Sequence, residues 1–247
     1  MPQALVNLSS KEYPGRLIII GQDRTGEKAI IVYAITGRSP SSQARRMVEQ
    51  TDGIWVRPTD EDILRKGNPD LLIYPALLYG QGIAVSNGKQ TTDVKNSLSV
   101  LPNPVDVLKS ALSGWDYEPD EPTFTPRISG CVLPNAKAAL SVIRRAEDGF
   151  SLRNYFGVSL SPGKGKLVST YSGENIDPLP PYTGEPEEIL LDKNTAQETV
   201  HDVYEALSPK EHAKDFRVSV VSVFIQPEDP TLIETAIINR SERNGNG

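Results

Sequence analysis

Short apolar runs separated by turn-forming residues dominate this chain of 247 residues and predict a protein built mainly of antiparallel strands. The first two runs are joined by Gln-Asp-Arg-Thr-Gly-Glu-Lys, a sequence typical of a hairpin turn. Further hairpins are predicted within residues 71–86 and 155–171, where Gly80-Gln-Gly82 and Ser161-Pro-Gly-Lys-Gly165 interrupt the apolar runs. The predicted strands are residues 17–21, 29–35, 71–78, 83–86, 127–133, 139–145, 155–160, 166–171 and 217–225.

Two segments instead have the period of a helix. Asn103 is a good N-cap followed by Pro104 at the first helical position, and apolar residues then recur at helical spacing, which predicts a helix over about 104–113. Thr195-Ala-Gln-Glu198 is a capping box that opens the second helix. Many hairpins and two helices together predict an α+β chain with mainly antiparallel sheet.

The Pro-rich connector 178–186 is the one candidate boundary between domains. The segment of about 60 residues after it holds only one helix and one or two strands, too little for a second core. We therefore predict one domain over residues 1–247, with residues 240–247 as a frayed tail.

Composition and charge exclude several classes of protein. A hydrophobic content of 38% and a charged content of 23% are those of a soluble globular protein, and the net charge of -6 argues against a nucleic-acid-coating surface. No run of 18 apolar residues predicts a membrane span, and the N-terminus lacks the features of a signal peptide. A single cysteine, Cys131, with two histidines, His201 and His212, argues against both an internal disulfide and a zinc site. We expect a cytoplasmic protein without structural metals, in which Cys131 is a small core residue.

The segment Gly114-Trp-Asp-Tyr-Glu118 carries the most informative candidate chemistry. It places Asp116 and Glu118 two residues apart just after the first predicted helix, where alternation would direct both carboxylates to one side. Neighbouring carboxylates raise the pKa of one of them, so that the pair can both donate and accept protons near neutral pH. The alternative is two solvated acids in an acidic loop, and this segment alone does not decide between them.

Three other clusters combine ionisable and hydrogen-bonding residues. They are Tyr13-Pro-Gly-Arg16, the basic loop Gly37-Arg-Ser-Pro-Ser-Ser-Gln-Ala-Arg-Arg46, and the pair of segments 68–74 and 86–90, which contain Tyr74 and Asn87. Arginine in such a loop suits the binding of a phosphate or the polarisation of a carbonyl. Each cluster alone is more often turn chemistry or a surface ion pair. Their combination is what points to a site.

Taken in order, these segments resemble the archaeal-type IMP cyclohydrolase family. The matching stretches are Tyr13-Pro-Gly-Arg16, Gly37-Arg38-Ser39, Asn68-Pro69 with Tyr74, Ser86-Asn87-Gly88, Asp116-Tyr117-Glu118 and Thr125-Pro126-Arg127-Ile128, with looser matches at Tyr171-Ser-Gly and Leu179-Pro-Pro-Tyr-Thr-Gly-Glu-Pro186. The resemblance implies a four-layer α-β-β-α sandwich of the N-terminal-nucleophile-hydrolase type, without the N-terminal nucleophile. It also implies ring closure of 5-formamidoimidazole-4-carboxamide ribotide to IMP, the last step of purine synthesis.

The same resemblance implies roles for individual residues. Arg38 and Tyr74 would hydrogen-bond the formyl or carboxamide oxygen, Asp116 and Glu118 would move protons, and Asn87 would orient the carboxamide. Weaker candidates for binding the 5′-phosphate are Arg16, Arg45 and Lys89. The reaction requires no metal and no organic cofactor. The implied partner is a small purine ribotide, and the oligomeric state, a homo-oligomer included, is left open.

Departures from the family pattern leave alternatives. Gln43 stands where the pattern has a second arginine, so Arg45 or Arg46 should replace it, unless both are solvated residues on a short helix after Pro40. Pro75 stands where the pattern has asparagine, which removes a backbone donor and a side-chain amide. A related amidohydrolase acting on another purine-like ribotide, or a nucleotide-binding module without turnover, therefore remain alternatives to an IMP cyclohydrolase.

Overall fold

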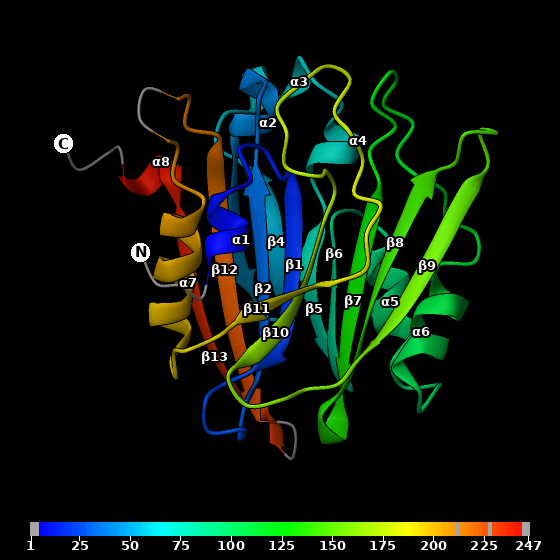
Figure 1. The fold of residues 1–247 in the computed structure, drawn as a ribbon, viewed down its shortest axis with the longest axis vertical. Coiled ribbons are helices and arrows are strands. Elements are labelled where there is room, and N and C mark those ends of the chain that lie inside the picture. Colours follow the sequence, from blue (N-terminus) through cyan, green and yellow to red (C-terminus); the bar gives the residue numbers. More distant parts are fainter. Residues whose placement is uncertain (1–4, 211–212, 227–228, 244–247) are drawn as a thin grey trace.

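Two antiparallel sheets stacked face to face form the body of the protein in the computed structural model, which describes residues 5–210, 213–226 and 229–243 (Figure 1). The first sheet has six strands in the spatial order β11 (Glu187–Leu190), β10 (Lys164–Ser169), β1 (Arg16–Gln22), β2 (Ala29–Thr36), β12 (Arg217–Gln226) and β13 (Asp229–Asn239). The second has seven, in the order β3 (Arg45–Gln50), β4 (Gly53–Pro58), β5 (Pro75–Gly80), β6 (Gly82–Ser86), β7 (Arg127–Leu133), β8 (Lys137–Arg145) and β9 (Ser151–Val158). The structure therefore confirms the α+β class with antiparallel sheets.

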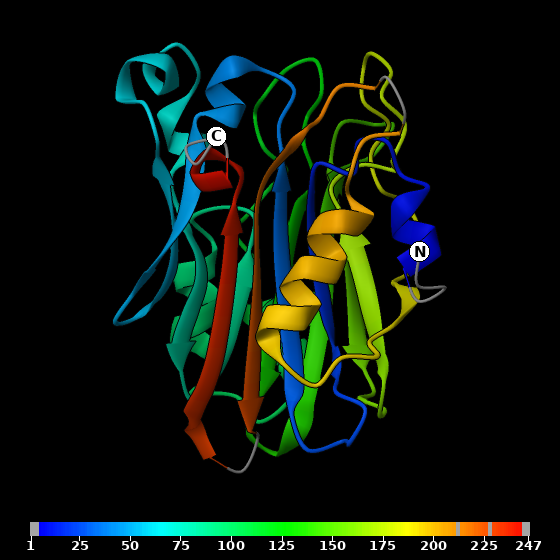
Figure 2. The ribbon, with the colours of Figure 1, turned by 90° about the vertical axis from the view of Figure 1, so that its left-hand side faces the viewer.

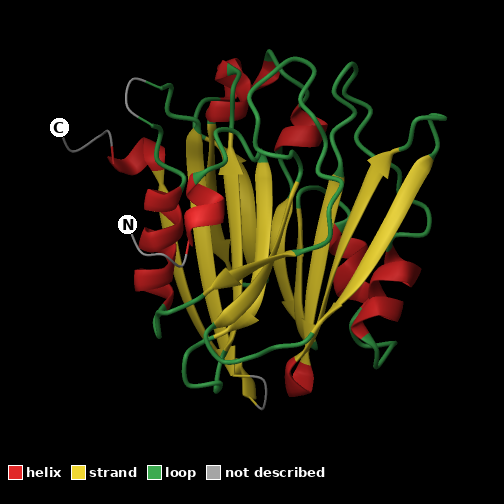
Figure 3. Cartoon of the chain, in the orientation of Figure 1, coloured by secondary structure: helices red, strands yellow, loops and turns green. Residues whose placement is uncertain are grey.

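Helices pack on the outer faces of the sheets, as Figure 2 and Figure 3 show. The longest, α7 (Ala196–Ala206), lies against β12 and β13 of the first sheet, and α5 (Thr91–Ser97) and α6 (Pro104–Ala111) lie against the second. The remaining helices are short: α1 (Val6–Ser9), α2 (Pro40–Gln43), α3 (Glu61–Arg65), α4 (Pro69–Leu72) and α8 (Arg240–Arg243). None of the helices within the described ranges is long and apolar enough to cross a membrane.

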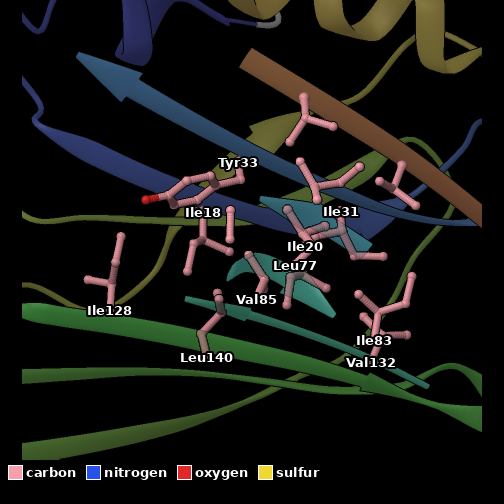
Figure 4. Close-up of a cluster of buried hydrophobic side chains, with 14 of the residues drawn as sticks. Ile18, Ile20, Ile31, Tyr33, Leu77, Ile83, Val85, Ile128, Val132 and Leu140 are labelled. Atoms are coloured by element: carbon pink, nitrogen blue, oxygen red, sulfur yellow. The ribbon is translucent and has the colours of Figure 1, made fainter. Parts of the chain in front are cut away.

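Alternation along the strands divides the apolar residues among three layers of core. Ile18, Ile20 and Ile31 of the first sheet point inward and meet Val85 and Leu140 of the second (Figure 4). Their sequence neighbours point outward, into one core under α7 and another under α5 and α6. Because β1 and β2 are covered on both faces, they read as continuous apolar runs.

Most predicted elements are confirmed, including the Asn103 cap and Pro104 start of α6 and the Thr195 cap of α7. The predicted strand 71–78 is wrong in its first half, because α4 occupies Pro69–Leu72 and β5 begins only at Pro75. The predicted tail begins in the helix Arg240–Arg243, and residues 244–247 lie outside the described ranges.

The predicted hairpin within residues 155–171 is also wrong. β9 pairs with β8 in the second sheet, whereas β10 pairs with β1 in the first, so the chain crosses between sheets here. The turn itself is present, with Ser161 bridged to Lys164. Turn residues report a local reversal of the chain and do not specify which strand it will pair with, which explains the error.

Cys131 is a core residue, as the sequence predicted. It is fully buried in β7 and packs in the core under α5 and α6. Burial raises the pKa of its thiol to about 12, so the reactive thiolate is strongly disfavoured.

Candidate active site

Several strands begin or end beside candidate site residues at one end of the two stacked sheets. β1 begins there at Arg16, β7 begins at Arg127, and β6 ends at Ser86, directly before Asn87 (Figure 1, upper end). Tyr74 precedes β5 at the same end. Because antiparallel strands alternate in direction, starts and ends that are distant in sequence meet here.

A buried ion pair between Arg16 and Glu118 forms the centre of this end. The Nη2 atom of Arg16 donates to both carboxylate oxygens of Glu118, at 2.6 Å and 2.7 Å. The side chains retain only 12% and 2% of their exposure to solvent. Asn87 Nδ2 donates to the same carboxylate at 3.2 Å, and the guanidinium of Arg127 lies 3.9 Å away.

Burial and charge act in opposite directions on this pair. Burial raises the pKa of Glu118 above its ordinary value, while the charges of Arg16 and Arg127 work to lower it. Burial also disfavours the charge on Arg16, but the neighbouring carboxylate holds the pKa of its guanidinium well above the ordinary value. Arg16 is therefore a permanent cation, and Glu118 is a carboxyl group that takes up a proton more readily than a surface one.

Asn87 fixes the second sheet around the carboxylate. Its Nδ2 also donates to the carbonyl of Pro126 at 2.9 Å, and its Oδ1 accepts from the backbone N–H of Ile128 at 2.9 Å and from Gln90 Nε2 at 3.0 Å. With both ends of its amide engaged, Asn87 has a defined orientation. It positions Glu118 and is held by the start of β7.

A short loop holds the backbone of Glu118 from the other side. The N–H of Glu118 donates to the carbonyl of Thr125 at 2.8 Å, and Asp120 accepts from both the N–H and the hydroxyl of Thr125. The hydroxyl of Tyr171, which follows β10 of the first sheet, is 2.7 Å from the Thr125 hydroxyl. The charge of Asp120 adds to the raised pKa of Glu118, so Asp120 is a second acid that acts on this carboxyl.

Tyr74 is paired with a second buried tyrosine, Tyr33 of β2. Their hydroxyl oxygens are 2.7 Å apart, and both side chains are buried. Burial and the neighbouring Tyr74 raise the pKa of Tyr33 well above its ordinary value, against the opposing charges of Arg16 and Arg45. Tyr33 therefore keeps its proton at physiological pH, and it lies within electrostatic reach of both arginines.

Arg45 is buried, with 2% of its surface exposed, and opens β3 rather than lying on a helix. Its Nε donates to the carbonyl of Ser42 at 2.8 Å, but its Nη1 is buried without a hydrogen-bond partner among the described residues. Arg46, next in sequence, is half exposed and lies 3.7 Å from Glu242. Gln43 donates to the backbone carbonyls of Gly37 and, more weakly, Asp215, so it closes the loop. An unpaired buried guanidinium nitrogen is costly and marks a place for an oxygen acceptor.

Arg127 Nε donates to the backbone carbonyl of Asp116 at 2.8 Å and is under the influence of its charge, so the structure places Asp116 at the border of this cluster. Its carboxylate accepts from Ser151 at 2.7 Å and pairs with Arg153 at 3.0 Å, and it is 70% exposed. The expectation of one Asp116–Glu118 acid pair fails because residues 115–118 form an irregular bend rather than a strand, so side chains two apart do not share a face. The carboxyl that acts on Glu118 is Asp120.

Arg38 and Lys89 lie outside the buried centre. Arg38 bonds to Asn175 at 3.4 Å and Asp177 at 3.2 Å, and its guanidinium lies 5.5 Å from the centre of the Tyr13 ring. Lys89 is half exposed and pairs with Asp70 at 2.6 Å. These cations are available at the surface rather than beside Glu118.

Several residues of the site were missed by reasoning from the sequence. Tyr33 stands in a strand that is otherwise almost entirely aliphatic, and Arg127 opens a strand that is buried throughout. A polar group in such a run is the signal that was available for both. Thr125 and Arg127 lie in the stretch Thr125-Pro126-Arg127-Ile128 that resembles the family, although no role was assigned to either residue. Asp120 gave no comparable signal, because its role depends on how the loop folds.

No three His, Cys, Asp or Glu side chains within residues 5–210, 213–226 and 229–243 are grouped so as to hold a metal ion. His212 lies outside those ranges.

Comparison with known families assigns the chain. The family described as IMP cyclohydrolase-like protein matches residues 13–229, a span that contains every residue of the buried centre. The chain belongs to the IMP cyclohydrolase-like family.

Individual relatives agree with this assignment. The chain is similar to a protein of Halobacterium salinarum named IMP cyclohydrolase, with 26% identity over 194 residues, which cover 78% of this chain and 85% of that protein. It is also similar to a protein of Methanopyrus kandleri of the same name, with 32% identity over 117 residues, which cover 47% of this chain and 57% of that protein.

Replacing Arg16 by methionine should destabilise the protein by about 3–5 kcal/mol at neutral pH, since it leaves the Glu118 carboxylate buried without its cation. The free energy of unfolding of this variant should depend on pH, because the pKa of Glu118 is already raised in the folded state and would rise further without Arg16. The variant should keep its stability at pH values below 4.5, the ordinary pKa of a glutamate, where Glu118 is protonated. Its free energy of unfolding should fall as pH increases through the raised pKa of Glu118 in the folded state. Urea unfolding at about pH 5 and about pH 8 measures the difference.

The matched control is Arg65→Met, which removes an exposed ion-pairing arginine from α3. It should leave the unfolding midpoint nearly unchanged at both pH values. An Arg16→Met protein whose stability rises with pH would contradict the account of the ion pair.

Proposed function

We propose that the protein is an IMP cyclohydrolase, which closes 5-formamidoimidazole-4-carboxamide ribotide to IMP with loss of water. The observation that carries the proposal is the buried Glu118 carboxyl, held between Arg16 and Asn87 at the end of the inter-sheet space. Membership of the family and the names of the relatives support the same reaction.

The chemistry sets clear demands on the site. The carboxamide nitrogen attacks the formyl carbon, the formyl oxygen becomes a hydroxyl, and this hydroxyl then leaves as water. One proton comes from the carboxamide nitrogen and one from the formamido nitrogen, so the reaction is balanced without an external acid or base. An amide is a poor nucleophile, so the site must polarise the formyl oxygen and move protons between two places.

The buried residues meet these demands. Glu118, with its raised pKa, accepts a proton from the attacking nitrogen and returns it to the departing hydroxyl. Tyr74 donates a hydrogen bond to the formyl oxygen. Arg16 and Asn87 hold the Glu118 carboxyl in place, and in this arrangement Arg16 is no longer the best candidate for the phosphate.

The remaining cations suit the ends of the ribotide. Arg45 presents a buried, unpaired Nη1 to an anionic oxygen, which makes it the favoured phosphate ligand. Arg38 and Lys89 lie toward solvent, where their present partners Asp177 and Asp70 are themselves exposed. Both cations can exchange those carboxylates for substrate oxygens at little cost.

Broader expectations follow from the same proposal. We expect the fold to be a four-layer sandwich of the N-terminal-nucleophile-hydrolase type, which helices outside two stacked sheets support, and the core shared by both sheets supports a single domain. The substrate is a small nucleotide, and the protein acts in the cytoplasm. A module that only binds nucleotides would gain nothing from a buried carboxyl beside an anion, so turnover is favoured over binding alone.

Mixing the protein with the formylated ribotide should change the ultraviolet absorbance as the purine ring forms. Glu118→Gln should lower kcat by about 10²–10⁴-fold, the usual contribution of a general acid or base. Thermal melting of the variant checks that the fold survives the loss of the carboxylate beside Arg16.

Asp116→Asn is the matched control, since it makes the same change on the exposed acid of the same segment. Its kcat should stay within about tenfold of the wild type. A folded Glu118→Gln protein with normal turnover would remove Glu118 from proton transfer, and a wild type that forms no IMP would reject the proposed activity.

A second comparison tests the basic loop. Arg45→Met should weaken the binding of IMP by about 1.5–3 kcal/mol, the scale of a charged hydrogen bond, measured by calorimetry. Arg46→Met removes the exposed neighbour and should leave the affinity unchanged. Equal affinities in both variants would show that the loop does not bind the phosphate.

A further inference from the structure

Tyr33 carries a polar group into the most apolar part of the molecule. All eight residues of β2 are buried, and the side chain of Tyr33 points into the core between the sheets. In Figure 4 its ring packs beside Ile18 while its oxygen points away from the aliphatic cluster. A buried hydroxyl needs a partner, and this one is the hydroxyl of Tyr74 at 2.7 Å.

The surroundings of the two hydroxyls contain a surplus of donors. Each phenol has one proton to donate, and only one of the two protons is used in the bond between them. The charges of Arg16 and Arg45 both act on Tyr33, and arginine accepts no hydrogen bond. Arg16 Nε and Arg45 Nη1 are themselves buried donors without partners among the described residues. The phenol proton that is not used in the bond between the two tyrosines therefore needs an acceptor, and we expect a ligand to supply it.

We propose that Tyr33 is a positioning residue for the ring closure, which donates its proton to the Tyr74 oxygen and so directs the Tyr74 O–H at the formyl oxygen of the substrate. The inference rests on the proposed cyclohydrolase activity and adds a residue to it. A hydroxyl that accepts a hydrogen bond becomes a stronger donor, because bonded groups polarise one another. Tyr33 would thus both aim and strengthen the donor that polarises the formyl group.

Burial keeps Tyr33 in the form that this role needs. Its raised pKa means that it retains its proton throughout the physiological range, so it acts as a donor and not as a base. Its position on β2, which is paired on both sides by β1 and β12, gives it little freedom to move. A rigid neighbour is what a precise hydrogen-bond donor requires.

The alternative is that the tyrosine pair only joins the two sheets. Tyr33 belongs to the first sheet and Tyr74 leads into the second, so the bond does cross the interface. The structure offers a matched control for that role. Tyr79 of β5 and Thr235 of β13 also pair across the interface, with their hydroxyls 3.4 Å apart.

The experiment compares Tyr33→Phe, Tyr74→Phe, the double variant and Tyr79→Phe. Phenylalanine keeps the ring and removes only the hydroxyl. For each protein we would measure kcat and KM with the formylated ribotide, and the melting temperature. Tyr33→Phe should lower kcat by about tenfold to 10²-fold, the scale of a misaligned catalytic group, with KM changed by less than about twofold.

The double variant gives the sharper result. If Tyr33 acts through Tyr74, then adding Tyr33→Phe to Tyr74→Phe should lower kcat no further. Tyr79→Phe should retain the kcat of the wild type, whatever its melting temperature.

Other outcomes overturn the inference. Tyr33→Phe with the kcat of the wild type, or multiplicative losses in the double variant, would show that Tyr33 does not act through Tyr74. An equal loss of kcat in Tyr79→Phe would assign the effect to the joining of the sheets. A wild type without turnover would reject the proposed function and this inference with it, whereas an active wild type separates the two.

Discussion

The buried ion pair between Arg16 and Glu118 is the constraint on which the site depends. Arg16 begins a strand of the first sheet, and Glu118 lies on the loop that leads into the second, so the pair joins the sheets at the site. Two charges removed from water are tolerated only when they face each other and their remaining hydrogen-bonding atoms are satisfied. Asn87 and the loop that ends at Thr125 meet this requirement for Glu118, because they fix its side chain and its backbone, whereas Arg16 Nε is left without a partner among the described residues. The positions of the residues around Glu118 are therefore set by the need to stabilise a buried ion pair.

This solution divides the site into an interior and a rim. In the interior, the Glu118 carboxyl has a raised pKa and accepts from Arg16 and Asn87. Arg16 Nε and Arg45 Nη1 are buried there without a hydrogen-bond partner among the described residues. Such a place suits a ligand rich in oxygen acceptors that also has an N–H to give up, as a carboxamide does. At the rim, Arg38 and Lys89 are paired with exposed carboxylates and can exchange them for ligand oxygens. The interior provides the proton chemistry, and the rim provides charge for binding.

Local signals in the sequence predicted the features that local physics determines. The cap at Asn103 and the apolar runs of β1, β2 and β7 were recognised, because periodicity and capping act over a few residues. Glu118 was proposed first as one of two neighbouring acids, and resemblance to a family then implied a role for both Glu118 and Asn87.

What failed was decided by contacts between distant segments. Asp116 was paired with Glu118 by alternation, but the segment bends, and Arg153 of β9 binds Asp116 instead. The turn at Ser161 predicted a hairpin, but the two flanking strands pair with other strands, β9 with β8 and β10 with β1. Tyr33 was not predicted as a site residue, because the hydrogen bond of its hydroxyl is to Tyr74, which lies 41 residues away in sequence. Neither propensity nor periodicity contains such pairings, which arise only when the two sheets stack.

A crystal structure of the protein with IMP would test the central claim most directly. The account predicts that the purine ring lies at the end of the inter-sheet space, within hydrogen-bonding distance of Glu118 and of the Tyr74 hydroxyl, with the phosphate at Arg45. IMP bound instead in the surface hollow of about 620 Å³ lined by Lys11, Glu12 and Asn175, with the inter-sheet end empty, would contradict it.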